Sequence, residues 1–119
     1  MNKKNIDKLI PQAMQELQSF SKNGVIDKKN QGYLASFGPT VISSGILQTV
    51  MFYTADKDKN KMIKIMFTLI KDDLQGNYTS MQEMLNDNSN YKDYSIKNKI
   101  LEANIACKLA IRTFELKEE

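Results

Sequence analysis

Residues 30–55 read NQGYLASFGPTVISSGILQTVMFYTA, twenty-six positions without a charged side chain in a chain that is 26% charged. A helix that spans a membrane needs about twenty consecutive, predominantly apolar residues. This segment is interrupted at Gly38-Pro39 and at Ser43-Ser44-Gly45, and its longest apolar run is Val50-Met51-Phe52-Tyr53. We therefore expect the segment to pack inside a folded domain, and we predict no membrane partner.

Within the segment, the residue pattern predicts two helices that meet at a tight corner. The first helix is expected over 28–37, because Gly38-Pro39 is a strong helix-stop signal. A short helical turn can follow through Val41-Ile42. Ser44 is then expected to cap a helix from Gly45 to Thr54, and a helix without charge on any side is expected to be buried on most sides. The aromatic residues predicted to lie in the core are Tyr33, Phe37, Phe52, Tyr53 and Phe67.

The rest of the chain also follows helical periodicity. Apolar residues at three- and four-residue spacings predict further helices over residues 6–20, 61–73 and 95–116. Pro11 is best accommodated if Asp7 caps the first of these helices, and otherwise it kinks the helix. Thr79/Ser80 with Gln82/Glu83 form a capping box for one more short helix, and no alternating strand pattern is present. The sequence predicts one domain, residues 1–119, with an all-α fold: a compact bundle of five or six helices.

Composition favours a folded protein of the cytoplasm. Apolar residues make up 41% of the chain, which is typical of a globular fold rather than of disorder. No apolar segment lies within the first twenty residues, so we expect no signal peptide. The single Cys107 cannot form an internal disulfide, which fits a reducing compartment.

Few residues suit catalysis. Histidine, the commonest general acid–base and metal ligand, is absent from the sequence. Cys107 falls on the apolar face of the last predicted helix. The carboxylate pairs Asp72-Asp73 and Asp56/Asp58 could hold a metal, but a helix end fits the first pair better and a polar loop the second. The glycines are scattered and form no phosphate-binding loop. We therefore predict a protein that is not an enzyme, with no metal site and no cofactor.

Charge is divided unevenly, and two rows of cations are candidate nucleic-acid contacts. Residues 1–71 carry eleven lysines and five acidic residues, a net charge of +6, whereas residues 72–119 have a net charge of −3. One row follows the helix predicted over 61–73, and the other shares a face of the last helix with Asn104. Such a row can follow a phosphate backbone without reading bases, or it can be the solvated side of an amphipathic helix. The candidate RNA-binding residues are Lys28, Lys29, Lys57, Lys61, Lys64, Lys71, Lys97, Lys108 and Arg112, and Tyr78, Tyr91 and Tyr94 are placed to stack on a base.

The neutral segment also carries a pattern that resembles a known family. The residues concerned are Tyr33, Pro39, Ile42, Ser44, Gly45, Ile46, Phe52 and Tyr53. They are similar to the central signature of the small helical subunit of the Cmr complex, the fifth Cmr protein of type III-B CRISPR RNA-targeting effectors. That signature has a tyrosine-bearing helix, a Leu-Pro corner, an isoleucine, an Asn-Gly-Leu helix start and an Ala-Phe-Tyr helix end. The chain departs from it at Gly38, Ser44 and Met51, and it reads Glu115-Leu116-Lys117-Glu118-Glu119 where the family has a basic aromatic cluster.

The resemblance implies a non-catalytic structural subunit in antiviral defence. In that family the small subunits stack as a filament beside backbone subunits and form a basic groove along the guide RNA–target RNA duplex. The implied partners are therefore RNA and other Cmr subunits, namely the backbone subunit, further copies of the small subunit and the large-subunit end. Alternatives are the type III-A small subunit and a small helical regulatory or antitoxin-like module that binds a protein. A DNA-binding helix-turn-helix is disfavoured because the corner around Gly38-Pro39 is uncharged.

Overall fold

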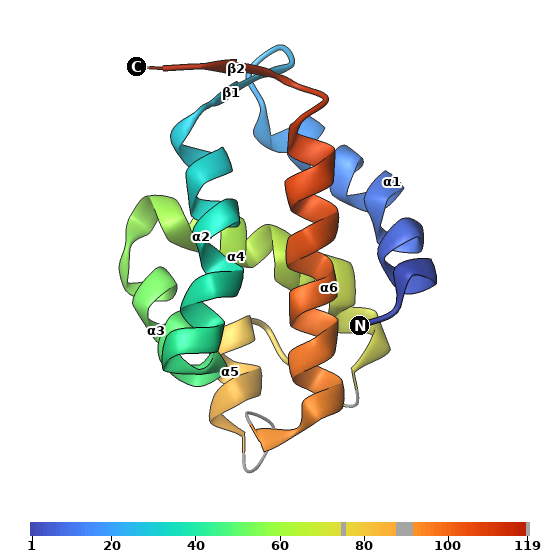
Figure 1. The fold of residues 1–119 in the computed structure, drawn as a ribbon, viewed down its shortest axis with the longest axis vertical. Helices are drawn as coiled ribbons and strands as arrows, with labels where there is room; N and C mark the ends of the chain where they lie inside the picture. Colours follow the sequence, from blue (N-terminus) through green and yellow to red (C-terminus); the bar gives the residue numbers. More distant parts are fainter. Residues whose placement is uncertain (75, 88–91, 119) are drawn as a thin grey trace.

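Helices make up most of the computed structural model, which describes residues 1–74, 76–87 and 92–118 (Figure 1). In chain order the elements are α1 (Lys3–Phe20), β1 (Val25–Asp27), α2 (Lys29–Ser44), α3 (Ile46–Ala55), α4 (Lys57–Ile70), the 3₁₀ turn η1 (Lys71–Asp73), α5 (Met81–Asn86), α6 (Tyr94–Ile111) and β2 (Glu115–Lys117). The described residues thus form six α-helices, and the predicted helical bundle is confirmed.

Helix α6 lies at the centre of the bundle. Helices α1 and α2 pack along its two sides, and α4 packs behind it (Figure 1). Small side chains on its buried face, Ala103, Cys107 and Ala110, allow these neighbours to approach closely. The buried apolar side chains of the described residues join in one core. Within the same residues, no helix is both long enough and apolar enough to cross a membrane.

Helix α2 runs straight through Gly38-Pro39, so the predicted helix end at Phe37 is wrong, and Val41-Ile42 belongs to the same helix. The stop signal is overridden by burial. Phe37 and Val41 lie on either side of the glycine–proline pair, and both are almost fully buried against the core. Burying two such side chains contributes about 3–6 kcal/mol, which offsets the roughly 3 kcal/mol that a proline costs inside a helix.

Side chains add hydrogen bonds to carbonyls of α2 near Pro39. Proline has no N–H to donate to the preceding turn. The Thr40 hydroxyl donates to the Ser36 carbonyl at 2.7 Å, and the Asn104 amide of α6 donates to the Leu34 carbonyl at 3.0 Å. The second bond crosses from α6 to α2, and it requires a buried Asn104. The expectation that Asn104 shares the solvent-facing side of α6 is therefore wrong.

The corner between α2 and α3 exists, but it lies at the surface rather than in the core. It is formed by Gly45, whose φ of 86° and ψ of 161° are accessible to almost no other residue. Ser44 is the last residue of α2 and provides no side-chain cap to α3, so the predicted cap is wrong. Ile46, the first residue of α3, is buried.

The prediction that α3 is buried on most sides is also wrong. Its buried residues are Ile46, Thr49, Val50 and Tyr53, which all lie on one side of the helix. Phe52 is 71% exposed, and Ile42 near the end of α2 is 84% exposed. Helix α3 lies at the edge of the bundle (Figure 1), where a neighbour covers only part of its surface. An uncharged helix therefore need not be a buried one.

Helices α1 and α4, whose first turns are rich in lysine, both begin earlier than the sequence predicts. Asn2, not Asp7, caps α1, and Pro11 consequently lies inside that helix. The Asn2 backbone N–H donates to the buried Glu102 carboxylate of α6 at 2.8 Å, which fixes this end of α1. Asp56 caps α4, so that the predicted loop 56–60 is the first turn of the helix. At its other end α4 stops at Ile70 and passes into η1 instead of reaching Asp73.

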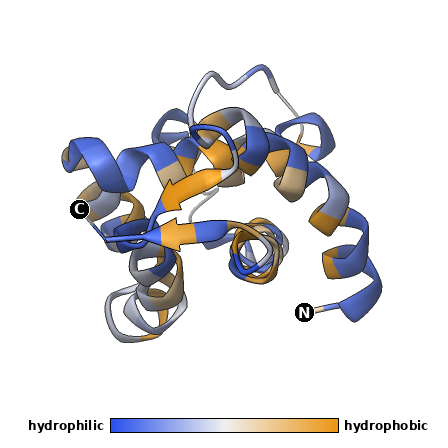
Figure 2. Cartoon of the chain, turned by 90° about the horizontal axis from the view of Figure 1, so that it is seen from above, coloured by the Kyte–Doolittle hydropathy of each residue, from blue (hydrophilic) through white to orange (hydrophobic). Residues whose placement is uncertain are grey.

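The expectation that no strands occur is wrong, because the last predicted helix ends early. Helix α6 stops at Ile111, and β2 (Glu115–Lys117) pairs in parallel with β1 (Val25–Asp27). Figure 2, seen from above, shows the two short strands side by side. The Lys28 N–H donates to the Lys117 carbonyl at 2.9 Å. These backbone bonds, together with the buried Ile26, hold the tail across the top of the bundle.

The capping box is confirmed. The Ser80 hydroxyl accepts a hydrogen bond from the Glu83 N–H at 3.0 Å, and the Glu83 carboxylate accepts from the Thr79 N–H and hydroxyl. Met81, Met84 and Leu85 of α5 are buried. Asn88 to Tyr91, which follow this helix in the chain, lie outside the described residues.

Candidate nucleic-acid interface

The solvent-facing side of α4 is lined by lysines. From residue 57 to residue 71, the exposed side chains are Lys57, Lys61, Lys64 and Lys71, which we call the lysine ridge. The opposite side of α4 is buried in the core through residues that include Met62, Met66 and Ile70. Because the inner side is fixed by packing, the outer side presents mainly cations, together with the partly exposed Asp58 carboxylate. This row is the first candidate interface that the sequence predicts.

Acidic neighbours partly neutralise Lys61 of the ridge and two lysines near it. The Lys29 Nζ lies 3.0 Å from Asp58 Oδ2, and the Lys61 Nζ lies 3.7 Å from Asp58 Oδ1. The hydrogen bond from Lys29 holds the pKa of the Asp58 carboxyl below its usual value. The Lys28 Nζ lies 3.7 Å from a Glu118 carboxylate oxygen. Lys28, Lys29 and Lys61 are therefore partly satisfied within the protein.

The remaining members of the ridge carry unneutralised charge. Among the residues that the structure describes, Lys57, Lys64 and Lys71 make no ion pair with an acidic side chain. They lie seven residues apart, and this spacing drifts around the helix by only about 20° per step. The three free cations therefore form one straight row about 20 Å long, from the rise of about 1.5 Å per residue.

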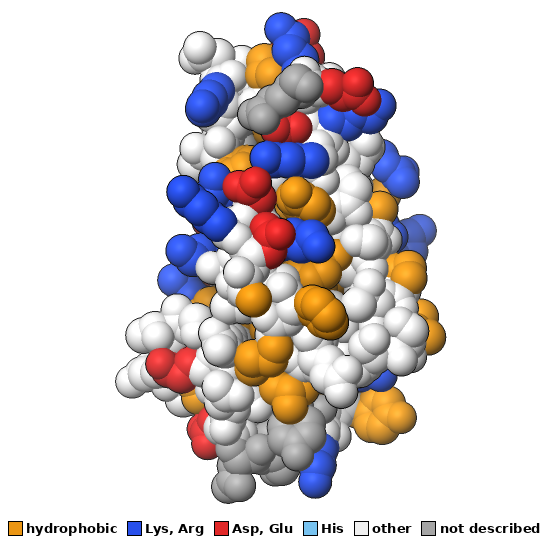
Figure 3. Space-filling view, turned by 90° about the vertical axis from the view of Figure 1, so that its left-hand side faces the viewer, with side chains coloured by type: hydrophobic (Ala, Val, Ile, Leu, Met, Phe, Trp, Pro, Cys, Tyr) orange, Lys and Arg blue, Asp and Glu red, His pale blue; other side chains and the backbone are white. Residues whose placement is uncertain are grey.

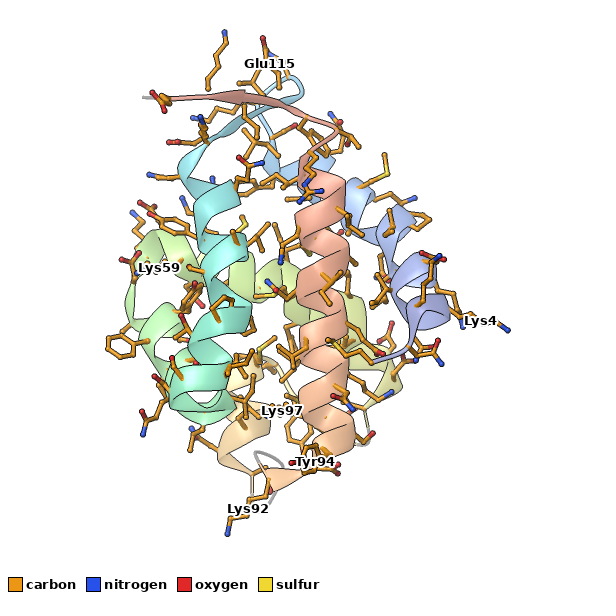
Figure 4. All side chains as sticks on the ribbon, viewed as in Figure 1. Lys4, Lys59, Lys92, Tyr94, Lys97 and Glu115 are labelled. Carbon is orange, nitrogen blue, oxygen red and sulfur yellow. The ribbon has the colours of Figure 1, made fainter. Side chains whose placement is uncertain are left out.

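The second row of cations does not join the first. Lys97 and Lys108 are half-buried on α6, and Arg112 is exposed just beyond its end. Helix α4 lies behind α6 and packs against it (Figure 1), so the exposed sides of the two helices face away from each other. Figure 4 shows Lys97 beside Tyr94 at the lower end of α6, with its Nζ 5.7 Å from the centre of the Tyr94 ring. One straight groove cannot contain both rows.

The predicted stacking tyrosines have different environments. Tyr94 is 76% exposed. The Tyr78 hydroxyl donates to the Asp87 carboxylate at 2.5 Å, so this ring is held in place rather than free. Tyr91 lies outside the described residues.

A cation that sequence reasoning missed lies between two aromatic rings. The Lys59 Nζ is 5.7 Å from the centre of the Tyr33 ring and 5.6 Å from that of the Tyr53 ring. The Tyr53 hydroxyl in turn bonds to the Ser36 hydroxyl and the Tyr33 carbonyl, and burial raises its pKa. The signature residues Tyr33 and Tyr53 thus join α2, α3 and α4. The i, i+20 tyrosine pair gave no sequence signal of this contact.

An uncharged surface lies next to the ridge. The exposed side chains of α2 and α3 within residues 30–55, here called the uncharged face, are Gly32, Ala35, Ser36, Pro39, Ile42, Ser43, Ser44, Gln48, Phe52 and Ala55, with Gly45 between the helices. Figure 3 views this side of the molecule, with lysine and arginine side chains at its upper and left edges and a largely white and orange area below them. The signature residues Pro39, Ile42, Ser44, Gly45 and Phe52 thus belong to this surface, and not to the core.

The residues considered for catalysis or metal binding lie in the core, at a helix cap and in a 3₁₀ turn. Cys107 is fully buried, and burial raises the pKa of its thiol to about 12, so the thiolate nucleophile is hardly formed at neutral pH. Asp56 caps α4 with its side chain, and Asp72-Asp73 is exposed in η1. In the described part of the chain, no three acidic or thiol side chains gather in a way that could hold a metal ion.

Fold and surface together define a small helical protein with a cationic side and a neighbouring uncharged side. No family model, no curated protein and no solved structure matches the chain.

Proposed function

We propose that the chain is a non-catalytic RNA-contacting subunit of a type III-B CRISPR (Cmr) effector complex in the cytoplasm. The lysine ridge carries the proposal, because a helix whose most exposed side chains from residue 57 to residue 71 are all lysines can track phosphates of any sequence. The resemblance of residues 33–53 to the Cmr small subunit is the reason for proposing this particular complex. The proposed partners are the guide RNA–target RNA duplex and the other Cmr subunits.

The uncharged face supports the proposed contact with other protein subunits. Interfaces between proteins are depleted of charge at their centre and enriched in aromatic residues. Phe52 and Ile42 are exposed on this face with no charged residue of their own segment beside them in sequence. We assign the face to a neighbouring subunit. The same observation favours the second candidate function, a small helical regulatory or antitoxin-like module that binds one protein and no RNA.

The salt dependence of RNA binding separates these functions. The variant Lys57→Gln/Lys64→Gln/Lys71→Gln removes the three free cations of the ridge. Each phosphate contact to single-stranded RNA contributes about 0.7 to the slope of log affinity against log salt, so the slope should flatten by about two units. The loss should be similar for RNAs of different sequence, because phosphate contacts carry no base information. Fluorescence anisotropy of labelled RNA, at several salt concentrations, measures both quantities.

The matched control is Lys97→Gln/Lys108→Gln/Arg112→Gln, which removes the same charge from the opposite side of the molecule. Its slope should stay close to that of the unchanged chain. The measurement is made on the chain alone and on the complex assembled with the subunits encoded beside it, since one small subunit touches few phosphates. Equal slopes for the ridge variant and the unchanged chain would refute the RNA proposal. Absence of any RNA affinity, with retained binding to a protein partner, would favour the regulatory module.

A further inference from the structure

A cleft of about 650 Å³ opens beside the second half of the lysine ridge, between α4 and the beginning of α5. Two ridge lysines, Lys64 and Lys71, contribute to its lining, and no acidic residue among the described ones does. A smaller cleft near β1, of about 360 Å³, is also lined by lysines, but Asp27, Asp58 and Glu118 line it too. Of these two lysine-lined clefts, only the larger one has no acidic side chain in its described lining.

The lining of this cleft combines apolar side chains with amide and hydroxyl groups. Ile63, Phe67 and Met81 are buried core residues whose side chains reach the cleft. Asn60 and Gln82 are half-buried lining residues, and their side-chain amides have no hydrogen-bond partner among the residues that the structure describes. Each such amide offers donors and an acceptor together. A matching ligand therefore has an apolar body, both hydrogen-bond donors and hydrogen-bond acceptors at its edges, and a negative charge.

One lining hydroxyl differs from the others in the helices. Thr40, Thr49 and Thr68 each donate to the carbonyl four residues earlier, which is the usual arrangement of a helical threonine. The Oγ1 of Thr54, which lines the cleft at the end of α3, is buried and has no hydrogen-bond partner in the described structure. Rotation about χ1 exchanges the methyl group and the hydroxyl of a threonine. A polar ligand in the cleft would give this hydroxyl a partner.

We infer that the cleft binds one nucleotide, with its phosphate against Lys64 and Lys71 and its base against the apolar side chains of the lining. Inorganic phosphate would leave those side chains and the amides unoccupied, whereas a fatty acid would leave the amides and Thr54 without partners. The volume lies within the range of about 300–1,000 Å³ that is usual for sites of small ligands. The nucleotide comes either from solution or from an RNA strand on the ridge, and the second source rests on the proposed function.

Methyl NMR on the full chain tests the site directly. With ¹³C-methyl methionine and isoleucine labels, AMP and UMP should shift Met81 and Ile63 in a saturable manner. Inorganic phosphate at the same concentrations should leave both signals in place. Met14, which lies on α1 and does not line the cleft, is the internal control. Shifts of Met14 equal to those of Met81, or no saturable shift at all, would overturn the nucleotide site.

Substitutions then separate the cleft from the ridge. Lys64→Gln and Lys71→Gln should each weaken mononucleotide binding about tenfold, the usual effect of losing a charged hydrogen bond. Gln82→Leu should weaken it several-fold although it changes no charge. Lys57→Gln is the matched control, because Lys57 belongs to the ridge but not to the cleft lining; mononucleotide affinity should be unchanged. An equal effect of Lys57→Gln and Lys64→Gln would show that only general charge is involved.

RNA oligomers distinguish this inference from the proposed function. A short RNA should shift Met81, and the same oligomer without bases should bind more weakly and leave Met81 in place. Salt-dependent RNA binding that is identical for the two oligomers, with no shift of Met81, would overturn the cleft while the ridge stands. Mononucleotide binding without any RNA binding would support the cleft with the free nucleotide as its source and would refute the proposed function. Binding of neither would overturn both.

Discussion

Replacement of Gly45 by alanine tests whether the α2–α3 corner is held by backbone geometry. Gly45 has φ 86° and ψ 161°, a region that only glycine occupies without strain. A Cβ at this position would meet no atom within 4 Å, so steric contact adds nothing. The strain costs about 1–3 kcal/mol, and the reduced freedom of the unfolded chain offsets about 0.4–1 kcal/mol. We expect a net loss of about 1–2 kcal/mol.

Urea unfolding followed by far-UV circular dichroism measures this loss. For a chain of 119 residues, 1 kcal/mol corresponds to about 4 °C in Tm, so a parallel thermal scan should show a fall of about 4–8 °C. The urea midpoint should fall with an unchanged slope, because the fold itself is retained.

Gly32→Ala is the matched control for this measurement. Gly32 lies inside α2 and is exposed, and a Cβ added there would also meet no atom within 4 Å, but its backbone is helical. Alanine should therefore stabilise the protein there by about 0.5–1 kcal/mol. The two identical substitutions thus have opposite predicted signs. If Gly45→Ala leaves the urea midpoint unchanged or raises it, the geometry that we assign to the corner is wrong.

Two further predictions follow from the titrating groups. Because burial raises the pKa of Cys107 to about 12, iodoacetamide at pH 8 should leave the native protein unmodified and alkylate it fully in urea. Mass spectrometry measures the alkylation, and a native protein alkylated as fully as the unfolded one would show that the thiol is accessible. Since Lys29 lowers the pKa of Asp58, the pair stabilises the folded state above the unfolded pKa of the carboxyl, and this contribution is lost as the pH falls through the lower folded pKa. In Lys29→Ala, NMR titration should find the Asp58 pKa moved upward toward its usual value, and an unmoved pKa would contradict the assignment of its cause.

Local chemistry made several features of this protein predictable. The inner side of α4 follows from apolar residues such as Met62, Met66 and Ile70 at helical spacing, because a helix must bury its apolar side. The lysine ridge is the other side of the same pattern. The capping box at Ser80 is a bond between residues three apart, which sequence alone specifies. These features depend on near neighbours in the chain.

The features that the sequence did not predict depend on distant residues. Whether α2 stops at Pro39 is decided by the core that buries Phe37 and Val41, and most of that core comes from other helices. Whether Phe52 is buried depends on how many helices surround α3. Residues 115 and 116 are predicted to end the last helix, yet residues 115–117 pair with β1, ninety positions earlier in the chain. The amino-acid sequence by itself determined the helices and their cationic side, because those need only local periodicity; the tertiary structure alone decided the uncharged face and the cleft, because exposure is a property of what packs nearby.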